Sequence, residues 1–286
     1  MAAYAPPVVD PRRVVQVVVD AADAELAADA LWQAQPSAVL EVDLGDGTVR
    51  LTADVAGPSP VAARWGATKL VVDDDGYLDA WRSWAAPVRA GRRIVVHPAW
   101  LPLGDPGDDL VLLIDPGRAF GSGTHESTRL ALALLEDLLR PGDRVLDVGC
   151  GSGVLSVAAC RLGAAWAAAV DLEGEAVTAT RANAERNGVA ARVRASTASL
   201  HELAGPFDLV VANIGGGVLP RLAPELGPRV APGGRLVLSG LLEEQVDAVV
   251  ASVVSAVPSC EEVDRVAEAG WAAVWLRRVS PGRPSD

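Results

Sequence analysis

The sequence predicts an α/β protein in which a small α+β unit precedes a doubly wound parallel sheet. From Arg93 onward, continuous apolar strand patterns alternate with helical patterns, which is typical of parallel strands covered on both faces. A glycine-rich run, VLDVGCGSG, directly follows one of these strands. The first 54 residues instead show a strand–helix–strand–strand order. A chain of 286 residues is long enough for two such domains.

The N-terminal unit is expected at residues 1–72. Residues 13–21 are rich in β-branched residues, as a strand is, and residues 23–33 show the apolar spacing of a helix. The stretch AVLEVDLGDGTVRLTADV then contains two strand patterns around the turn residues Gly45 to Gly47. These elements predict a small α+β domain with no glycine-rich ligand-binding turn of its own.

A linker with a short helix is predicted at residues 73–92. It opens with the acidic turn DDDG, and Pro87 ends the helical stretch. Trp81 and Trp84 are three residues apart and therefore share one helix face. They either pack between the two domains or contribute to substrate binding.

The C-terminal domain is predicted at residues 93–286. Strands are expected at residues 94–100, 109–115, 144–149, 167–171, 207–214, 235–240 and 271–278, and helices at 126–139, 154–162, 177–187 and 243–256. Because this order alternates strands with helices, we expect all of these strands in one parallel sheet.

The composition narrows the classes of partner and compartment. The formal net charge of −12 argues against direct binding of DNA or RNA, which requires a basic surface, and is compatible with a basic protein or a small molecule. We find no secretory signal and no apolar run of about 18 residues, so no membrane association is expected. The three cysteines fit a reducing cytoplasm, and no metal-ligand spacing is present.

The run VLDVGCGSG predicts a phosphate- or cofactor-binding turn. Gly149, Gly151 and Gly153 occupy alternate positions between a buried strand and a helix. Glycine permits a tight turn and close approach of the backbone to a ligand, and the helix N-terminus beyond it favours negative charge. The spacing differs from the usual G-x-G-x-x-G of dinucleotide sites, and a purely structural turn is the alternative.

Asp171 ends the next strand, twenty residues beyond Gly151. A carboxylate at this position can accept hydrogen bonds from the two hydroxyls of a ribose. Its alternative role is to cap the following helix. Together the glycine turn and Asp171 predict a nucleoside-containing cofactor without saying which one, and an NAD-dependent dehydrogenase remains a competing interpretation.

Four segments in order, VLDVGCGSG, AVDLEGEAV, FDLVVANI and PGGRLVLSG, resemble the successive motifs of class I S-adenosylmethionine-dependent methyltransferases. Together with DPGRAFGSGTHEST, they resemble more closely the ribosomal protein L11 methyltransferase family (PrmA). The likeness covers nearly the whole chain and is weakest over the first 60 residues. It implies a Rossmann-like class I methyltransferase domain preceded by a small α+β, ferredoxin-like domain.

The resemblance also implies an activity and a set of site residues. The family methylates lysine side chains and the N-terminal α-amine of ribosomal protein L11, with S-adenosyl-L-methionine as cofactor. Its cofactor contacts correspond to Thr128, Gly149, Asp171 and Asn213, with Gly151 in the same turn, and Phe120 is expected to pack on the cofactor or cover its reacting end. We therefore expect the two glycine-rich segments to form two walls of one pocket, with Asn213 and Phe120 nearest the chemistry.

The segment after Asn213 departs from the related motifs. Ile214 to Gly217 replace the prolines and aromatic residue that hold a planar base or amide in other methyltransferases, which argues against those substrates. The triple glycine exceeds that of the family, and we expect a more mobile loop there. His125 either contributes to the pocket as a proton acceptor or caps and packs at a helix start.

Two other kinds of function stay open from the sequence. One keeps the cofactor and changes the substrate to another protein or a small molecule. The other is a cofactor-binding module without turnover, against which the presence of Thr128, Gly149, Asp171 and Asn213 argues.

Overall fold

The computed structural model describes residues 13–32, 39–54, 64–65, 68–71, 85–117, 121, 123–257 and 259–279. The chain divides into two compact units, Met1–Ala85 and Ala86–Asp286. This division lies within the stretch 73–92 that the sequence assigns to a linker. The short helix expected there, with Trp81 and Trp84, lies outside the described residues, so its role stays a prediction.

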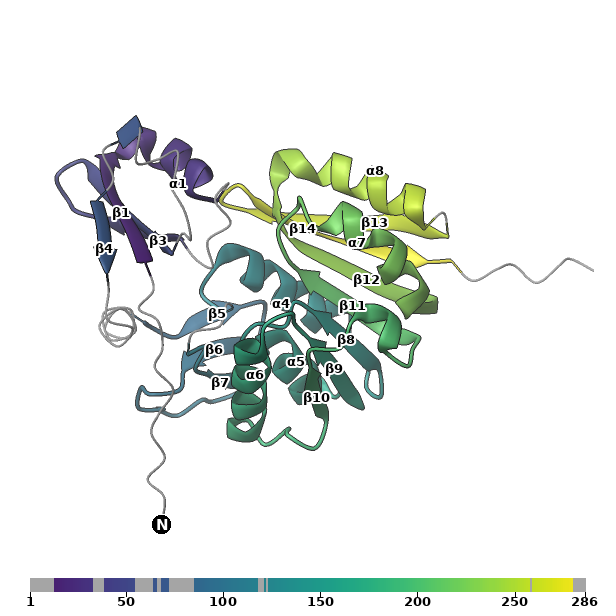
Figure 1. The fold of residues 1–286 in the computed structure, drawn as a ribbon. Coiled ribbons are helices and arrows are strands. Elements are labelled where there is room, and N and C mark those ends of the chain that lie inside the picture. The colour runs from purple at the N-terminus through teal and green to yellow at the C-terminus, as the bar shows by residue number, and fades with distance from the viewer. Residues whose placement is uncertain are drawn as a thin grey trace, which may run out of the picture. The chain divides into compact units, whose positions relative to one another are not determined.

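The N-terminal unit contains a four-stranded antiparallel sheet of order β2-β3-β1-β4 and one described α-helix (Figure 1). Its elements are β1 (Arg13–Asp20), α1 (Ala24–Trp32), β2 (Val39–Asp43), β3 (Thr48–Asp54) and β4 (Thr68–Val71). Val15, Val17 and Val19 alternate along β1 and form its core face with Ala27 and Leu31 of α1. A ferredoxin-like domain requires a second helix between β3 and β4. Most residues between these strands lie outside the described ranges, so that assignment stays a prediction.

The unit Ala86–Asp286 is built on a seven-stranded sheet of order β10-β9-β8-β11-β12-β14-β13 (Figure 1). Its strands are β8 (Arg144–Val148), β9 (Trp166–Val170), β10 (Val193–Ser196), β11 (Phe207–Asn213), β12 (Val230–Leu242), β13 (Cys260–Glu268) and β14 (Trp271–Arg278). β8 is the first strand of this sheet along the chain; β9 and β10 follow on one side of it, and the later strands lie on the other side, as the doubly wound prediction requires.

The expectation of a wholly parallel sheet is wrong at one edge. β14 runs antiparallel to β12, and β13 runs antiparallel to β14. The cause is the turn at Ala269 and Gly270, where both residues have positive φ, because such a turn joins two adjacent antiparallel strands. The sheet is therefore mixed, with five parallel strands and an antiparallel hairpin.

Helices cover both faces of this sheet. They are α4 (Glu126–Leu138), α5 (Val154–Leu162), α6 (Gly174–Arg186), α7 (Leu219–Leu226) and α8 (Val246–Ala256). Along β8, Val145 joins a core with α4, α5 and α6, whereas Leu146 joins the opposite core with α7 and α8. Among the described residues, none of the helices has the length and apolar character that a bilayer crossing requires.

A second small sheet of order β5-β6-β7 packs into the same core as α4 and α5. Its strands are β5 (Val88–Ala90), β6 (Ile94–Pro98) and β7 (Leu110–Ile114). The sequence predicts β6 and β7 correctly as strands but wrongly as members of the main sheet. Ile94 and Leu112 are fully buried in the core they share with the helices, and such burial yields the same apolar pattern in either sheet.

A buried ion pair ties several of these elements together. Arg235 on β12 lies 3.0 Å from Asp143, and both side chains are at most one-tenth exposed. Arg235 also donates to the carbonyl oxygens of Leu138 and Asp208, at the end of α4 and on β11. One guanidinium thus joins β12 to the end of α4, the start of β8 and β11.

We expect Arg235→Ala to lower the free energy of unfolding by about 3–5 kcal/mol, because it leaves Asp143 buried and unpaired. The matched control is Arg277→Ala, since Arg277 is the cross-strand neighbour of Arg235 on β14 and forms an exposed pair with Glu261. That control should cost about 1 kcal/mol or less. Urea denaturation of both variants measures the difference, and equal losses would contradict this account.

Candidate cofactor and active site

The glycine turn between β8 and α5 is a backbone cradle that side chains would fill. Gly149, Gly151 and Gly153 all have positive φ, a conformation that favours glycine. A Cβ on Gly149 would lie 2.5 Å from Cγ2 of Ile214, and one on Gly153 would lie 2.9 Å from Cα of Thr180. α5 begins directly after Gly153, so its free N–H groups face the turn.

Asp171 holds this turn from the end of β9. One carboxylate oxygen accepts from N–H of Gly151 at 2.9 Å, and the other accepts from N–H of Glu173 at 3.0 Å. The N-cap position of α6 is occupied by Glu173, whose side chain makes no capping hydrogen bond, so the alternative of Asp171 as the N-cap residue is wrong. The carboxylate is half-buried, and each oxygen retains a lone pair that can accept a further hydrogen bond.

Leu172, the next residue, has a side chain that is 96% exposed. None of the patterns considered above points to Leu172. Its signal in the sequence is a large apolar residue directly after the acid that follows a strand.

Thr128 and Asn213, distant in sequence, lie together at the same edge of the sheet. Nδ2 of Asn213, at the end of β11, donates to Oγ1 of Thr128 in the first turn of α4 at 3.2 Å. Gly240 of β12 lies close against this edge: a Cβ there would lie 2.6 Å from the carbonyl oxygen of Ile214 and 3.2 Å from Oδ1 of Asn213. Thr128 is buried and Asn213 half-buried, so the pair is fixed at the base of the site.

The two glycine-rich segments contact each other. Oγ of Ser152, in the glycine turn, donates to the carbonyl oxygen of Gly121 at 2.5 Å. A Cβ on Gly121 would lie 3.1 Å from that same hydroxyl. Phe120 lies outside the described residues, so its expected packing on a cofactor stays a prediction.

His125 caps α4. Its Nδ1 accepts from N–H of Ser127 at 3.3 Å and pairs with the Ser127 hydroxyl at 2.8 Å. The ring also packs edge-on against Trp271, 4.5 Å away between centroids, and partial desolvation lowers the pKa of His125. Of the two roles left open by the sequence, the structure shows capping and packing.

The cysteines and acids give no sign of a metal centre. Cys150, Cys160 and Cys260 are all buried and reduced, as the sequence predicts. Within the described ranges, no three His, Cys, Asp or Glu side chains gather closely enough to hold a metal ion.

Asp147 lies fully buried on β8, two residues before Gly149 of the glycine turn. Its Oδ2 accepts from N–H and Oγ of Ser156 in the first turn of α5, at 3.1 and 2.7 Å, while Oδ1 has no partner among the described residues. Burial, with a smaller contribution from the negative charge of Asp171, raises the pKa of Asp147 to about 6. A carboxylate inside an apolar strand was the signal for it in the sequence.

Comparison with known proteins identifies the family. Residues 21–279 match the family model described as ribosomal protein L11 methyltransferase (PrmA). The chain belongs to this family.

The ribosomal protein L11 methyltransferase of Pelotomaculum thermopropionicum is 46% identical over 222 residues, which cover 77% of this chain and 70% of that protein. The relative of the same name from Geobacter sp. strain M21 is 45% identical over 214 residues, which cover 73% of this chain and 69% of that protein. A crystal structure of ribosomal protein L11 methylase from Lactobacillus delbrueckii subsp. bulgaricus has 29% sequence identity and a TM-score of 0.63, and covers 68% of this chain and all of that one.

Family membership confirms the resemblance seen in the sequence, the class I methyltransferase fold and S-adenosylmethionine as the cofactor. The described residues fit this group. At Gly149 and Gly153 a side chain would collide with Ile214 and Thr180, so glycine keeps the turn open to a ligand. The half-buried carboxylate of Asp171 and the exposed Leu172 follow at the end of the next strand. The dehydrogenase interpretation is therefore set aside.

We expect Asp147→Asn to remove a pH dependence of stability. The folded chain keeps Asp147 protonated up to about pH 6, whereas the unfolded chain releases this proton near pH 4, so this group's contribution to stability falls as pH rises between them. Relative to wild type, the variant should gain about 2–3 kcal/mol in unfolding free energy from pH 4 to pH 7. Urea denaturation across this range measures it, and a constant difference would refute the buried, proton-binding state.

Proposed function

We propose that this protein transfers methyl groups from S-adenosylmethionine to amino groups of ribosomal protein L11, both lysine side chains and the N-terminal α-amine. The observation that carries the proposal is the contact between the two glycine-rich segments, at the edge where Asp171 and Asn213 end their strands. The names of the relatives, which are up to 46% identical to this chain over the aligned residues, supply the substrate.

Each site residue takes a position along the cofactor in this proposal. Asp171 accepts from the ribose hydroxyls while its hydrogen bond to N–H of Gly151 keeps the turn in place. The exposed Leu172 side chain covers the apolar face of the adenine. Thr128 and Asn213, joined by their hydrogen bond, face the methionine end, where Phe120 closes the site.

The cofactor supplies a methyl group on a positively charged sulfur, which is already activated for transfer. The chain supplies position and the exclusion of water. The accepting amine must be neutral, and an apolar, partly closed site lowers the pKa of an amine by disfavouring its charge. Asn213 and the backbone carbonyls of the loop after it align the amine, and no side chain is required as an obligatory base.

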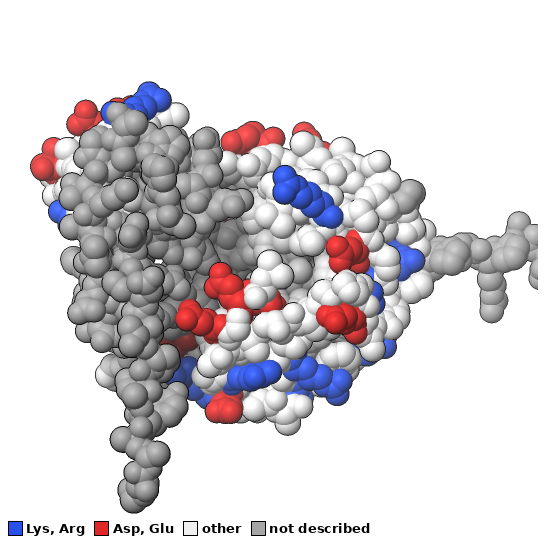
Figure 2. Space-filling view, in the orientation of Figure 1, with Lys and Arg blue, Asp and Glu red and all other residues white. Residues whose placement is uncertain are grey.

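The charge of the chain suits a basic protein substrate. Residues 1–85 contain 13 acidic and 6 basic side chains. On the face of the molecule that Figure 2 shows, acidic and basic side chains are interspersed, so no continuous basic surface for nucleic acid covers the visible described residues. We infer that the N-terminal unit binds the ribosomal protein and that the enzyme acts in the cytoplasm.

The direct test uses purified protein, radiolabelled S-adenosylmethionine, and large ribosomal subunits or free ribosomal proteins from cells lacking this activity. We expect a single labelled band at the mass of L11, and no transfer to small amines. Label on another protein or on small amines alone would overturn the substrate assignment. Cofactor binding without any transfer would support a binding module instead.

We expect Asp171→Ala to weaken cofactor binding by about 1.5–3 kcal/mol, because it removes hydrogen bonds to a charged acceptor. Glu173→Ala is the matched control: it lies two residues away, its side chain is exposed, and only its backbone N–H bonds to Asp171. That variant should bind as wild type does. Isothermal titration calorimetry with S-adenosylhomocysteine measures both, and unchanged affinity in Asp171→Ala would remove this residue from the ribose role.

A further inference from the structure

Asn183 of α6 and Asn187, the C-cap residue of that helix, cover the free edge of β7, which is the end strand of its small sheet. The side chain of Asn187 accepts a hydrogen bond from N–H of Leu113 at 2.9 Å and donates one to the carbonyl oxygen of Leu113 at 2.8 Å. Asn183 does the same for Asp115, at 3.0 and 2.9 Å. Residues two apart on a strand present their polar groups to the same edge, and asparagines four apart lie on the same helix face, so the two amides replace a neighbouring strand.

Asn183 makes one contact that Asn187 does not. Its Nδ2 also donates to the carbonyl oxygen of Ser152, at 2.9 Å, inside the cofactor turn. The corresponding second bond of Asn187 goes to the backbone of its own helix, at the carbonyl oxygen of Asn183. Asn183 is completely buried, and of the two it alone joins β7 to the glycine turn.

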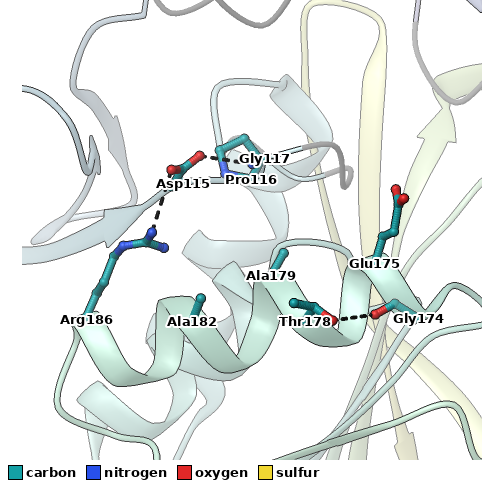
Figure 3. Close-up of a pocket in the computed structure, with 9 residues that line it drawn as sticks. All are labelled: Asp115, Pro116, Gly117, Gly174, Glu175, Thr178, Ala179, Ala182 and Arg186. Carbon is teal, nitrogen blue, oxygen red and sulfur yellow. Dashed lines mark hydrogen bonds and ion pairs between the residues drawn. The ribbon is translucent and has the colours of Figure 1, made fainter. Parts of the chain in front are cut away.

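The orientation of the Asn183 amide is fixed by its surroundings. Nη1 of Arg186 donates to Oδ1 of Asn183 at 2.8 Å, which places the oxygen toward Arg186 and N–H of Asp115 and the nitrogen toward the two carbonyls. Figure 3 shows Arg186 reaching from α6 across a groove to the carboxylate of Asp115, 3.7 Å away. On that opposite wall, N–H of Gly117 donates to the same carboxylate, so the start of the DPGRAFGSG segment is held from two sides.

We propose that Asn183 is a positioning residue that couples the segment 115–121 to the cofactor turn. It grips Asp115 at one end of that segment and, through Ser152, whose hydroxyl bonds Gly121, reaches the other end. The glycine turn and the two described ends of this segment, Asp115 and Gly121, are thereby held in one arrangement. This inference rests on the proposed cofactor site.

The test compares Asn183→Ala with Asn187→Ala. Both variants leave one strand-edge N–H and C=O without partners, so both should lose melting temperature to a similar extent. Only Asn183→Ala cuts the link to the cofactor turn. We expect its dissociation constant for S-adenosylhomocysteine to rise about tenfold in calorimetry, against less than about twofold for Asn187→Ala. Equal changes in the two variants would overturn the proposal.

A second readout needs no cofactor and separates this proposal from the proposed function. In the unliganded variants, hydrogen exchange should accelerate at the amides of Gly151 and Gly153 in Asn183→Ala and stay unchanged in Asn187→Ala. Failure of wild type to bind S-adenosylhomocysteine would count against the cofactor site, whereas equal exchange in both variants would count against the coupling.

A third measurement uses wild type alone and applies even where the variants fold poorly. Adding S-adenosylhomocysteine should slow exchange of the Asp115 amide, held by Asn183, at least fivefold more than that of the Leu113 amide, held by Asn187. Equal protection of the two amides would overturn the coupling.

Discussion

The turn between β8 and α5 depends on hydrogen bonds from outside itself, because its glycines have no side chains with which to hold their own conformation. Asp171 fixes N–H of Gly151, Thr180 fixes the carbonyl oxygen of Gly151, and Asn183 fixes that of Ser152. These three side chains come from the end of β9 and from α6, so the strand–helix unit after the turn determines its shape. A backbone that is held in this way can approach a ligand closely and needs no rearrangement to bind it.

Two further contacts explain why the two glycine-rich segments lie close together in the sequence. α4 connects them, and its first turn carries Thr128 to Asn213 on β11. Ser152, in the second segment, then donates a hydrogen bond to Gly121 in the first. The mixed sheet contributes at the other side of the site, where Gly240 of β12 approaches the backbone after Asn213 closely enough to exclude any side chain.

Much of the fold follows from patterns that the sequence displays. The prediction of a helix at 154–162 agrees with α5, and that at 126–139 differs from α4 by one residue, because both combine apolar faces with clear end signals. β13 was missed because most of its residues are polar and exposed, as an edge strand allows. α7 was missed because Pro220 and Pro224 interrupt a stretch of only eight residues.

The site shows where such prediction ends. Gly149, Gly151 and Asp171 follow from spacing, and Thr128 and Asn213 from resemblance, but the partners of Asn183 lie 31 and 68 residues away, and nothing in the pattern of α6 identifies them. Of the three glycines after Asn213, Gly216 has a packing reason that the sequence could not show. It is buried, and a Cβ there would lie 2.5 Å from Oε1 of Gln245, whereas Gly215 and Gly217 are exposed and have open space where a Cβ would lie.

The central claim is that both glycine-rich segments bind the same cofactor molecule. A crystal structure of the full chain with S-adenosylhomocysteine tests it most directly. We predict that residues of 115–121 and of 149–153 both contact the bound molecule, with its ribose hydroxyls on Asp171. A cofactor that contacts 149–153 alone, with the first segment turned away into solvent, would contradict the account.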